Sequence, residues 1–169
     1  MRKKLKSENK FIPVNSPKIY NQEKTYINKC LKSSWISSEG SFVKKFERDF
    51  SKYNKRIYGV AVSSGTAALE IAMKSLNLKK GDHVIIPSFT IISTALSVIK
   101  LGLKPILVDS NLYTWNMNCD EVIKKITKKT KAIIITHIYG HPVDMKKILS
   151  VARNKKIKIV EDAAEMIGQ

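Results

Sequence analysis

Short apolar runs recur at regular intervals through the second half of this chain, and the segments between them show helical spacing. Four of these runs are predicted to be strands: residues 83–86, 105–108, 132–135 and 157–160. Strands that are apolar throughout, with helices of roughly ten residues between them, are typical of a mainly parallel sheet covered on both faces. The pattern therefore predicts an α/β fold with three layers, a sheet between two helical layers.

The helices are predicted from apolar residues at three- and four-residue spacing. In the second half they cover residues 91–101, a segment beginning at Asp120, and residues 144–152. In the first half one helix spans residues 18–32, and a second follows Ser41, a plausible N-cap. The first 18 residues, which are polar and contain two prolines, are expected to form an extended arm.

A strand, a turn of small residues and a helix are predicted in direct succession near the middle of the chain. A β-type run at residues 57–62 is followed by Ser63, Ser64, Gly65 and Thr66, and then by a helical pattern. The first N–H groups of a helix lack intrahelical partners and lie at the positive end of the helix dipole. Gly65 lets a ligand approach the backbone, so this arrangement predicts an anion site. The alternative is that Ser64 or Thr66 only caps the helix.

Polar motifs follow the predicted strands one after another. In a parallel α/β sheet, ligands bind outside the carboxyl ends of the strands. The polar segments expected at that edge are residues 63–66, 87–90, 137–141 and 161–165, together with Asp109. We take His137 and His141 as structural. The clustering predicts one functional site at the carboxyl edge.

Length and composition indicate a globular domain with its own core. The chain has 169 residues, of which 43% are hydrophobic. Cys30 and Cys119 form no metal-binding or redox motif, so neither a metal site nor a disulfide scaffold is expected. We see no signal peptide and no apolar run long enough to span a bilayer, so the expected location is cytoplasmic, without a membrane partner.

The net charge of +17 comes from 31 Lys and Arg residues against 14 Asp and Glu. Only four of the basic residues are Arg, which is a poor match to bidentate recognition of bases or phosphates. The lysines are spread over several predicted helix faces, which favours a solvated surface with weak attraction to polyanions. We expect no specific nucleic-acid partner, although a basic nucleic-acid-binding module stays open as an alternative.

An acidic segment, residues 161–165, follows the last predicted strand. Asp162 is expected at the carboxyl end of that strand, with Glu165 one helical turn further on. Taken alone, the segment favours capping of a helix. Combined with a phosphate cradle at the same edge, it suggests pyridoxal 5′-phosphate (PLP), because an Asp keeps the ring nitrogen of PLP protonated by a charge-assisted hydrogen bond.

With these motifs in their order, the sequence resembles the DegT/DnrJ-type nucleotide-sugar aminotransferases, which are fold-type I PLP enzymes. The matching motifs are WISSEG (35–40), FE (46–47), SSGTAAL (63–69), GDHVIIPSFT (81–90), PILVD (105–109), YG (139–140), DM (144–145) and EDAAE (161–165). TWNMN (114–118) and Glu165 look most like the perosamine synthase branch. The resemblance implies the large domain of the fold-type I PLP-dependent transferases.

The same resemblance implies roles for particular residues. Asp162 would pair with the pyridinium nitrogen, and Glu165 would hydrogen-bond the phenolic oxygen of the cofactor ring. Ile91 stands where the family often has an aromatic residue that stacks on the ring, so an aliphatic side chain would cover the ring face here. The phosphate would be held by Gly65, Thr66 and Ala67.

The resemblance also implies an activity, and here the match to the family is partial. Such enzymes are dimers, with active sites at the subunit interface, that aminate the C4 keto group of a nucleotide-linked 4-keto-6-deoxyhexose with glutamate as donor. Their Schiff-base lysine lies downstream of the segment matching residues 161–165, and no lysine of this chain has a matching position. We therefore expect an inactive fragment that binds PLP weakly and without a covalent bond. Residues 1–40 are expected to form an arm, a helix and a loop, and residues 41–169 a partial PLP-binding domain. A His at the missing position would instead indicate a dehydratase of the same family.

Overall fold

The computed structural model describes residues 11–13 and 16–168. The chain divides into two units, Met1–Ala61 and Val62–Gln169. The expected extended arm, residues 1–18, lies largely outside the described residues. The boundary between the units falls later in the chain than residue 40, and the division predicted there stays a prediction.

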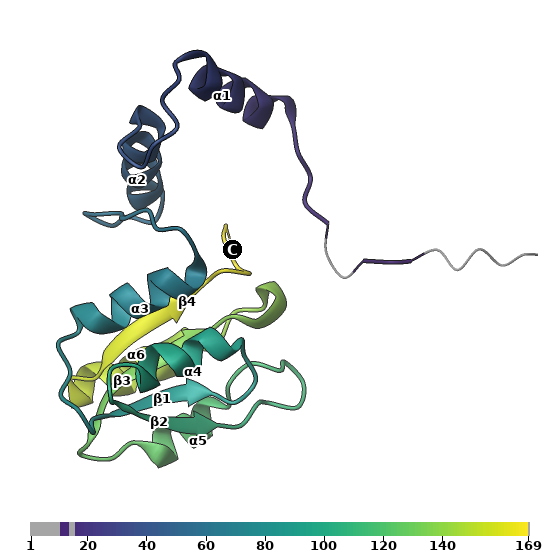
Figure 1. Cartoon of the computed structure of the whole chain (residues 1–169). Helices are drawn as coiled ribbons and strands as arrows, with labels where there is room; N and C mark the ends of the chain where they lie inside the picture. The colour runs from purple at the N-terminus through teal and green to yellow at the C-terminus, as the bar shows by residue number, and fades with distance from the viewer. Residues whose placement is uncertain (1–10, 14–15, 169) are drawn as a thin grey trace, which may run out of the picture. The chain divides into compact units, whose positions relative to one another are not determined.

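The first unit contains two helices, α1 (Asn21–Lys32) and α2 (Ser41–Tyr53), joined by a loop (Figure 1). Both agree with the sequence prediction, except that Gly40 rather than Ser41 is the N-cap of α2. Gly40 is buried, and a Cβ there would lie 2.9 Å from Cδ1 of Trp35, so the ring leaves room for glycine only. No residue of α1 is buried, and Ser51 is the one buried residue of α2.

The prediction of a strand at residues 57–62 is wrong. That segment is irregular, and Ile57, Tyr58 and Val60 are exposed. It runs along α2 instead: the Ala61 N–H donates to Oε1 of Glu47 at 2.8 Å, and a Cβ on Gly59 would lie 2.6 Å from the carbonyl oxygen of Glu47. Apolar β-type residues form a strand only where another strand pairs with them, and among the described residues none does so here.

The second unit is a four-stranded parallel sheet in the order β2-β1-β3-β4. All four predicted strands are confirmed. Three of them are longer than predicted: β1 (His83–Pro87), β2 (Lys104–Val108) and β3 (Thr130–Thr136). The fourth, β4 (Lys158–Asp162), begins one residue later and ends two residues later than predicted. The helices of this unit are α3 (Gly65–Ser75), α4 (Ile92–Ile99), α5 (Cys119–Lys125) and α6 (Met145–Lys155), with a short 3-10 turn η1 (Ile138–Gly140).

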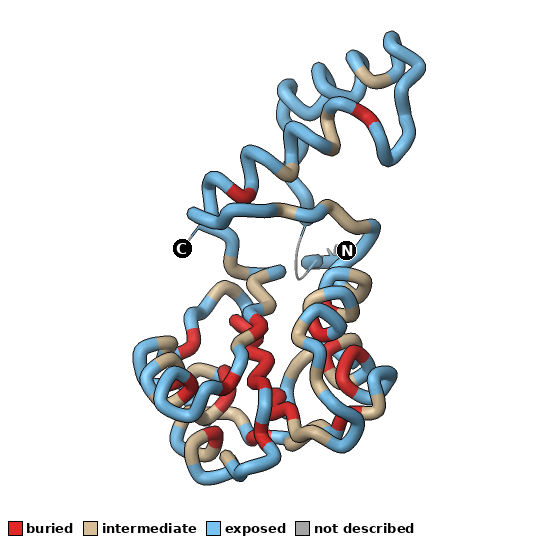
Figure 2. Tube along the Cα trace, turned by 90° about the vertical axis from the view of Figure 1, so that its left-hand side faces the viewer, coloured by how far each residue is buried: buried red, intermediate tan, exposed pale blue. Residues whose placement is uncertain are grey.

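Each face of the sheet has its own hydrophobic core, and successive strand residues belong to opposite cores. Val84 and Ile86 of β1 pack in one cluster and Ile85 in the other, as the period of two along a strand requires. The first cluster also contains Leu69 and Met73 of α3, while the second contains α6 residues such as Ile148. The expected three-layer α/β fold is confirmed, with α3 and α4 on one face and α5 and α6 on the other (Figure 1). In Figure 2 the buried positions follow the strands and the inner sides of these helices.

The strand order places a topological switch point between β1 and β3. From β1 the chain crosses through α4 to β2 on one side, and then through α5 to β3 on the other side of β1. The two connections therefore leave the neighbouring strands β1 and β3 in opposite directions. A crevice opens at such a point beyond the carboxyl ends of the strands, and it is where ligands bind in sheets of this kind.

Candidate functional site

The N-terminus of α3 has the form of an anion site. Ser64 is the N-cap, with an extended backbone, and its Oγ accepts a hydrogen bond of 3.2 Å from the Ala67 N–H. Within the described residues, the N–H groups of Gly65 and Thr66 have no acceptor. A Cβ added at Gly65 would meet no atom within 4 Å, so the space beside the Gly65 backbone is open. Two free N–H groups at the positive end of a helix suit a phosphate.

Two pairs of hydroxyl groups show where the N-terminus of α3 lies relative to the switch point between β1 and β3. Oγ1 of Thr66 lies 2.8 Å from Oγ of Ser93 in the first turn of α4. Thr90, in the loop after β1, donates from Oγ1 to Oγ1 of Thr136 at the end of β3, at 3.2 Å. The start of α3 is thus at the carboxyl edge of the sheet, and the Thr90 side chain links the loop after β1 to the end of β3. The sequence correctly placed Thr66 and Asp162 at the same edge of the sheet.

Asp162 is the last residue of β4, and it faces the side of the sheet that α3 covers. Val160, two residues earlier on the strand, packs in the same core as Leu69 of α3, and residues two apart on a strand share a face. The carboxylate is half-buried, and its Oδ1 accepts the Ala164 N–H at 3.2 Å. No described residue donates to the second oxygen, Oδ2. Asp162 therefore has one oxygen fixed by the backbone and one free for a cationic donor.

The helix expected to begin after β4 does not form within the described residues, because the chain there makes two turns. Glu165 is consequently placed by a tertiary contact rather than by helical spacing from Asp162. Its Oε2 accepts the N–H of Tyr139 at 2.6 Å, and Tyr139 has a left-handed backbone with φ 50° and ψ 34°. The 137–141 loop and the acidic segment, both predicted at this edge, are thus in direct contact.

Apolar side chains stand at the same edge. Ile91 is the N-cap residue of α4 and is exposed. Phe89, in the loop after β1, has its ring 5.6 Å from that of Trp115, which lies in the loop after β2. These positions do not test the predicted roles of Gly65, Thr66, Ala67, Ile91, Asp162 and Glu165, which stay predictions.

Two buried residues of the site had no part in the sequence prediction as functional groups. Asn116 is 2% exposed; its Oδ1 accepts the Ile138 N–H at 2.9 Å and its Nδ2 donates to the carbonyl of His141 at 2.7 Å. His137 is fully buried and uses both ring nitrogens. His137 directly follows β3 and could have drawn attention for that reason, whereas Asn116 lies in the loop between β2 and α5. Three of the partner groups lie 22 to 25 residues away in the chain, and only Val143 lies close to His137 in sequence.

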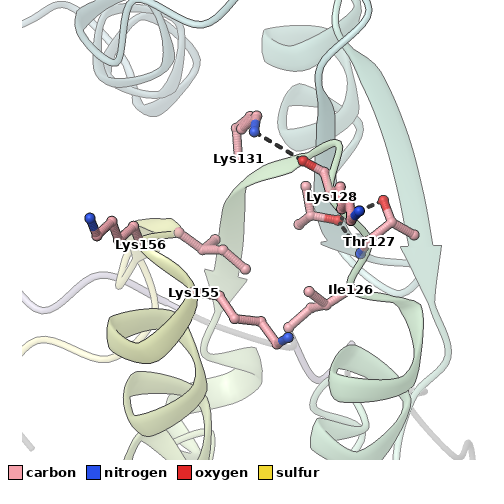
Figure 3. A pocket seen from close by; sticks show the side chains of 8 residues that line it. Ile126, Thr127, Lys128, Lys131, Lys155 and Lys156 are labelled. Carbon is pink, nitrogen blue, oxygen red and sulfur yellow. Dashed lines mark hydrogen bonds between the residues drawn. The ribbon is translucent and has the colours of Figure 1, made fainter.

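A pocket also exists at the opposite, amino edge of the sheet, between the approach to β3 and the end of α6 (Figure 3). It contains four exposed lysines: Lys128, Lys131, Lys155 and Lys156. The described residues hold no group of three His, Cys, Asp or Glu side chains that could bind a metal, there or elsewhere. The pocket is remote from the switch point, so we place the functional site at the carboxyl edge. Among the described helices, none is both long and apolar enough to cross a membrane.

Comparison with known proteins gives a family match over most of the chain. The model of the DegT/DnrJ/EryC1/StrS aminotransferase family matches residues 17–169. GDP-perosamine synthase of Escherichia coli O157:H7 is 43% identical over 159 residues, which cover 94% of this chain and 44% of that protein. GDP-perosamine synthase of Caulobacter vibrioides is 40% identical over 93% of this chain and 42% of its own length. The chain thus spans less than half the length of these relatives.

Comparison with solved structures agrees with the family match. A crystal structure of GDP-4-keto-6-deoxymannose-3-dehydratase with a trapped PLP-glutamate geminal diamine superposes with a TM-score of 0.87 and 29% sequence identity. The match covers 92% of this chain and 42% of that one. The expected fold-type I architecture, present in part, is confirmed.

Proposed function

This chain belongs to the DegT/DnrJ/EryC1/StrS aminotransferase family, and on that premise we propose that it forms the cofactor-binding part of a PLP-dependent sugar aminotransferase. The substrate is a nucleotide-linked 4-keto-6-deoxy sugar and the amino donor is glutamate. The similarity to two GDP-perosamine synthases supports this substrate class. The lysine that would bind PLP covalently is not assigned to this chain.

The observation that carries the proposal is a set of hydrogen-bonding groups at the carboxyl edge of the sheet that have no partner among the described residues. The free N–H groups of Gly65 and Thr66 suit the phosphate of PLP, and Oδ2 of Asp162 suits its protonated ring nitrogen. PLP, when bound, supplies an electron sink for carbanion chemistry. The chain's contribution is to neutralise the phosphate, to keep the ring nitrogen protonated, and to cover the ring with Ile91.

Other side chains of the edge orient these groups. The hydroxyl pair Thr66–Ser93 fixes the start of α3 against α4, and the Tyr139 N–H holds the Glu165 carboxylate. In this proposal Glu165 would hydrogen-bond the phenolic oxygen of the ring. The exposed aromatic residues at this edge would be covered in an intact dimer, which we propose for the whole protein.

PLP binding by the 169-residue chain tests the proposal. We expect saturable binding by absorbance titration, with weaker binding of pyridoxal because it lacks the phosphate. Asp162→Asn removes the charge that pairs with the ring nitrogen and should weaken PLP binding roughly tenfold. Asp120→Asn, a carboxylate on α5 paired with Lys147, is the matched control and should leave binding unchanged.

Two outcomes would contradict the proposal. One is equal PLP affinity in the wild-type chain and Asp162→Asn. The other is a salt-dependent affinity for DNA that exceeds the affinity for PLP, which would favour a nucleic-acid-binding role for the lysine-rich surface. Borohydride treatment followed by mass spectrometry should show no single labelled lysine. A single labelled site with turnover would show that a lysine of this chain acts covalently.

A dehydratase acting on the same sugar class is the second candidate, favoured by the fold match to a GDP-4-keto-6-deoxymannose-3-dehydratase. The two candidates share the cofactor contacts described here. They differ in whether the whole protein has a Lys or a His at the family's Schiff-base position. Assay of the whole protein for amino transfer from glutamate, against loss of water from the sugar, separates them.

A further inference from the structure

We propose that His137 is a positioning residue that orients Asp162 toward the cofactor ring and also holds the loop that contacts Glu165. The inference deepens the proposed function and rests on it. His137 itself touches neither the cofactor nor the substrate in this proposal, because its ring lies on the opposite side of the sheet from Asp162. It acts through its neighbours in the fold.

The hydrogen bonds of the ring determine which nitrogen carries the proton. The Val143 N–H donates to Nδ1 at 3.1 Å, and a backbone N–H can only donate, so Nδ1 is unprotonated. Nε2 then carries the proton and donates it to Oε1 of Glu161 at 3.0 Å. The ring therefore joins the loop after β3 to the end of β4.

Glu161 is the residue next to Asp162 on β4. Adjacent strand residues point to opposite faces, and Ile159, two residues before Glu161, packs in the core on the α5 and α6 side. When His137 holds Glu161 on that side, the end of the strand is fixed in rotation and Asp162 is held on the α3 side. The His137 N–H adds a backbone bond of 3.2 Å to the carbonyl of Asp162.

The second consequence concerns the loop of residues 137–143. The ring of His137 binds the far end of its own loop at Val143, so the loop is closed on itself. Between these ends Tyr139 donates to Glu165, and a Cβ on Gly140 would lie 3.2 Å from the carbonyl oxygen of Glu165. The two carboxylates that the proposed function uses, Asp162 and Glu165, are thus both held by one buried side chain.

A buried His with two satisfied nitrogens also stabilises the fold, so the test must separate orientation from stability. Glu161→Ala removes the acceptor of Nε2 at a side chain that is 39% exposed, so the chain should still fold. Glu161→Gln keeps an oxygen acceptor and is the conservative variant. His137→Phe keeps a buried ring without either hydrogen bond. Asp120→Ala, which removes an exposed carboxylate paired with Lys147, is the control.

Hydrogen exchange of two amides reports the orientation without any cofactor. The Ala164 N–H donates to Asp162 and the Tyr139 N–H donates to Glu165, so each reports one carboxylate. We expect roughly tenfold faster exchange at both amides in Glu161→Ala and His137→Phe. Exchange in Glu161→Gln and Asp120→Ala should match the wild-type chain. Unchanged exchange in Glu161→Ala would overturn the proposal.

PLP labelled with ¹⁵N at the ring supplies the second readout. In Glu161→Ala at saturating PLP, the ring nitrogen signal should shift toward that of the unprotonated ring, and the affinity should fall roughly tenfold, while Glu161→Gln rescues both. A loss of stability alone would not move the signal of the bound form. An unshifted signal in Glu161→Ala, or an equal loss in Asp120→Ala, would overturn the proposal. If the wild-type chain binds no PLP, the proposed function fails for this chain, and the amide exchange alone decides the role of His137.

Discussion

The two units of this chain use the same hydrophobic spacing with opposite results. In the second unit the strands and helices bury two continuous cores, with Ile85 and Val84 fully inaccessible. In the first unit α2 repeats aromatic residues at helical spacing, yet Phe46 is 54% exposed. Its ring stacks on Phe50 of the same helix, with 5.3 Å between ring centroids, and on no other ring among the described residues. An amphipathic pattern therefore predicts a helix, and a second element must supply the surface that buries its apolar face.

The largest effect is expected from a cavity in the second unit. Ile85→Ala removes a fully buried side chain from the core between the sheet and α6 and should lower the free energy of unfolding by about 2–5 kcal/mol. Urea denaturation followed by circular dichroism measures this change in the free energy of unfolding. Hydrogen exchange in α2 should be unchanged, since the core cluster that contains Ile85 includes no described residue of α2. A loss below about 1 kcal/mol, or faster exchange in α2, would break the contrast between the units.

A smaller loss is expected at the helix cap of the candidate site. Ser64→Ala deletes the side-chain acceptor of the Ala67 N–H and should cost about 1 kcal/mol, measured by the same denaturation. Ser64→Asn keeps a side-chain acceptor for the Ala67 N–H and should restore most of the lost stability. The first unit offers a comparison, because the N-cap of α2 is Gly40, which has no side chain to lose. No change in Ser64→Ala would show that the start of α3 is not held by its cap.

A still smaller effect is expected on the exposed face of α2. Phe46→Ala should change the free energy of unfolding by no more than about 0.5 kcal/mol, because the ring is already more than half in water. Ile85→Ala is the matched large-to-small control in the other unit. A loss at Phe46 as large as that at Ile85 would mean that this face is buried in solution. Analytical ultracentrifugation would then test whether a second copy of the chain covers it.

The smallest effect concerns exposed ion pairs, of which each unit has an example. Lys147 lies 2.5 Å from Asp120 and joins α6 to α5, and its side chain holds the pKa of Asp120 below the ordinary carboxylate value. In the first unit Lys45 and Arg48 lower the pKa of Asp49 within a single helix. Because each pKa is lowered on folding, the stabilisation is present above the ordinary carboxylate pKa and is lost as pH falls through the lowered value.

Melting temperatures of Asp120→Asn and Asp49→Asn against the wild-type chain, at pH 7 and pH 2, measure this contribution. Both variants should melt slightly below the wild-type chain at pH 7 and together with it at pH 2. The difference should be larger for Asp120, since its pair connects two helices of the packed unit. High salt should shrink both differences. A larger effect at pH 2 would contradict the sign derived from the lowered pKa.

The sequence alone determined the type and order of the elements in the second unit. The four apolar runs are strands because their β-branched residues can be buried on both faces, and the helices between them follow from spacing. The sequence also predicts which edge of the sheet carries the site, because crossover connections make the strands parallel and bring their carboxyl ends together. That is why Thr66 and Asp162, nearly one hundred residues apart, could be assigned to one edge before the structure was known.

Tertiary structure decided whatever depends on a partner distant in the chain. Residues 57–62 have strand character, but no strand of the described chain pairs with them, and they run along α2 instead. Glu165 is placed by the backbone of Tyr139 rather than by a helical turn from Asp162. The bond from His137 to Glu161 unites two strand ends that the sequence separates by 24 residues. Spacing along a chain reports which face of an element is apolar; only the packed strand order β2-β1-β3-β4 determines which polar groups meet beyond its ends.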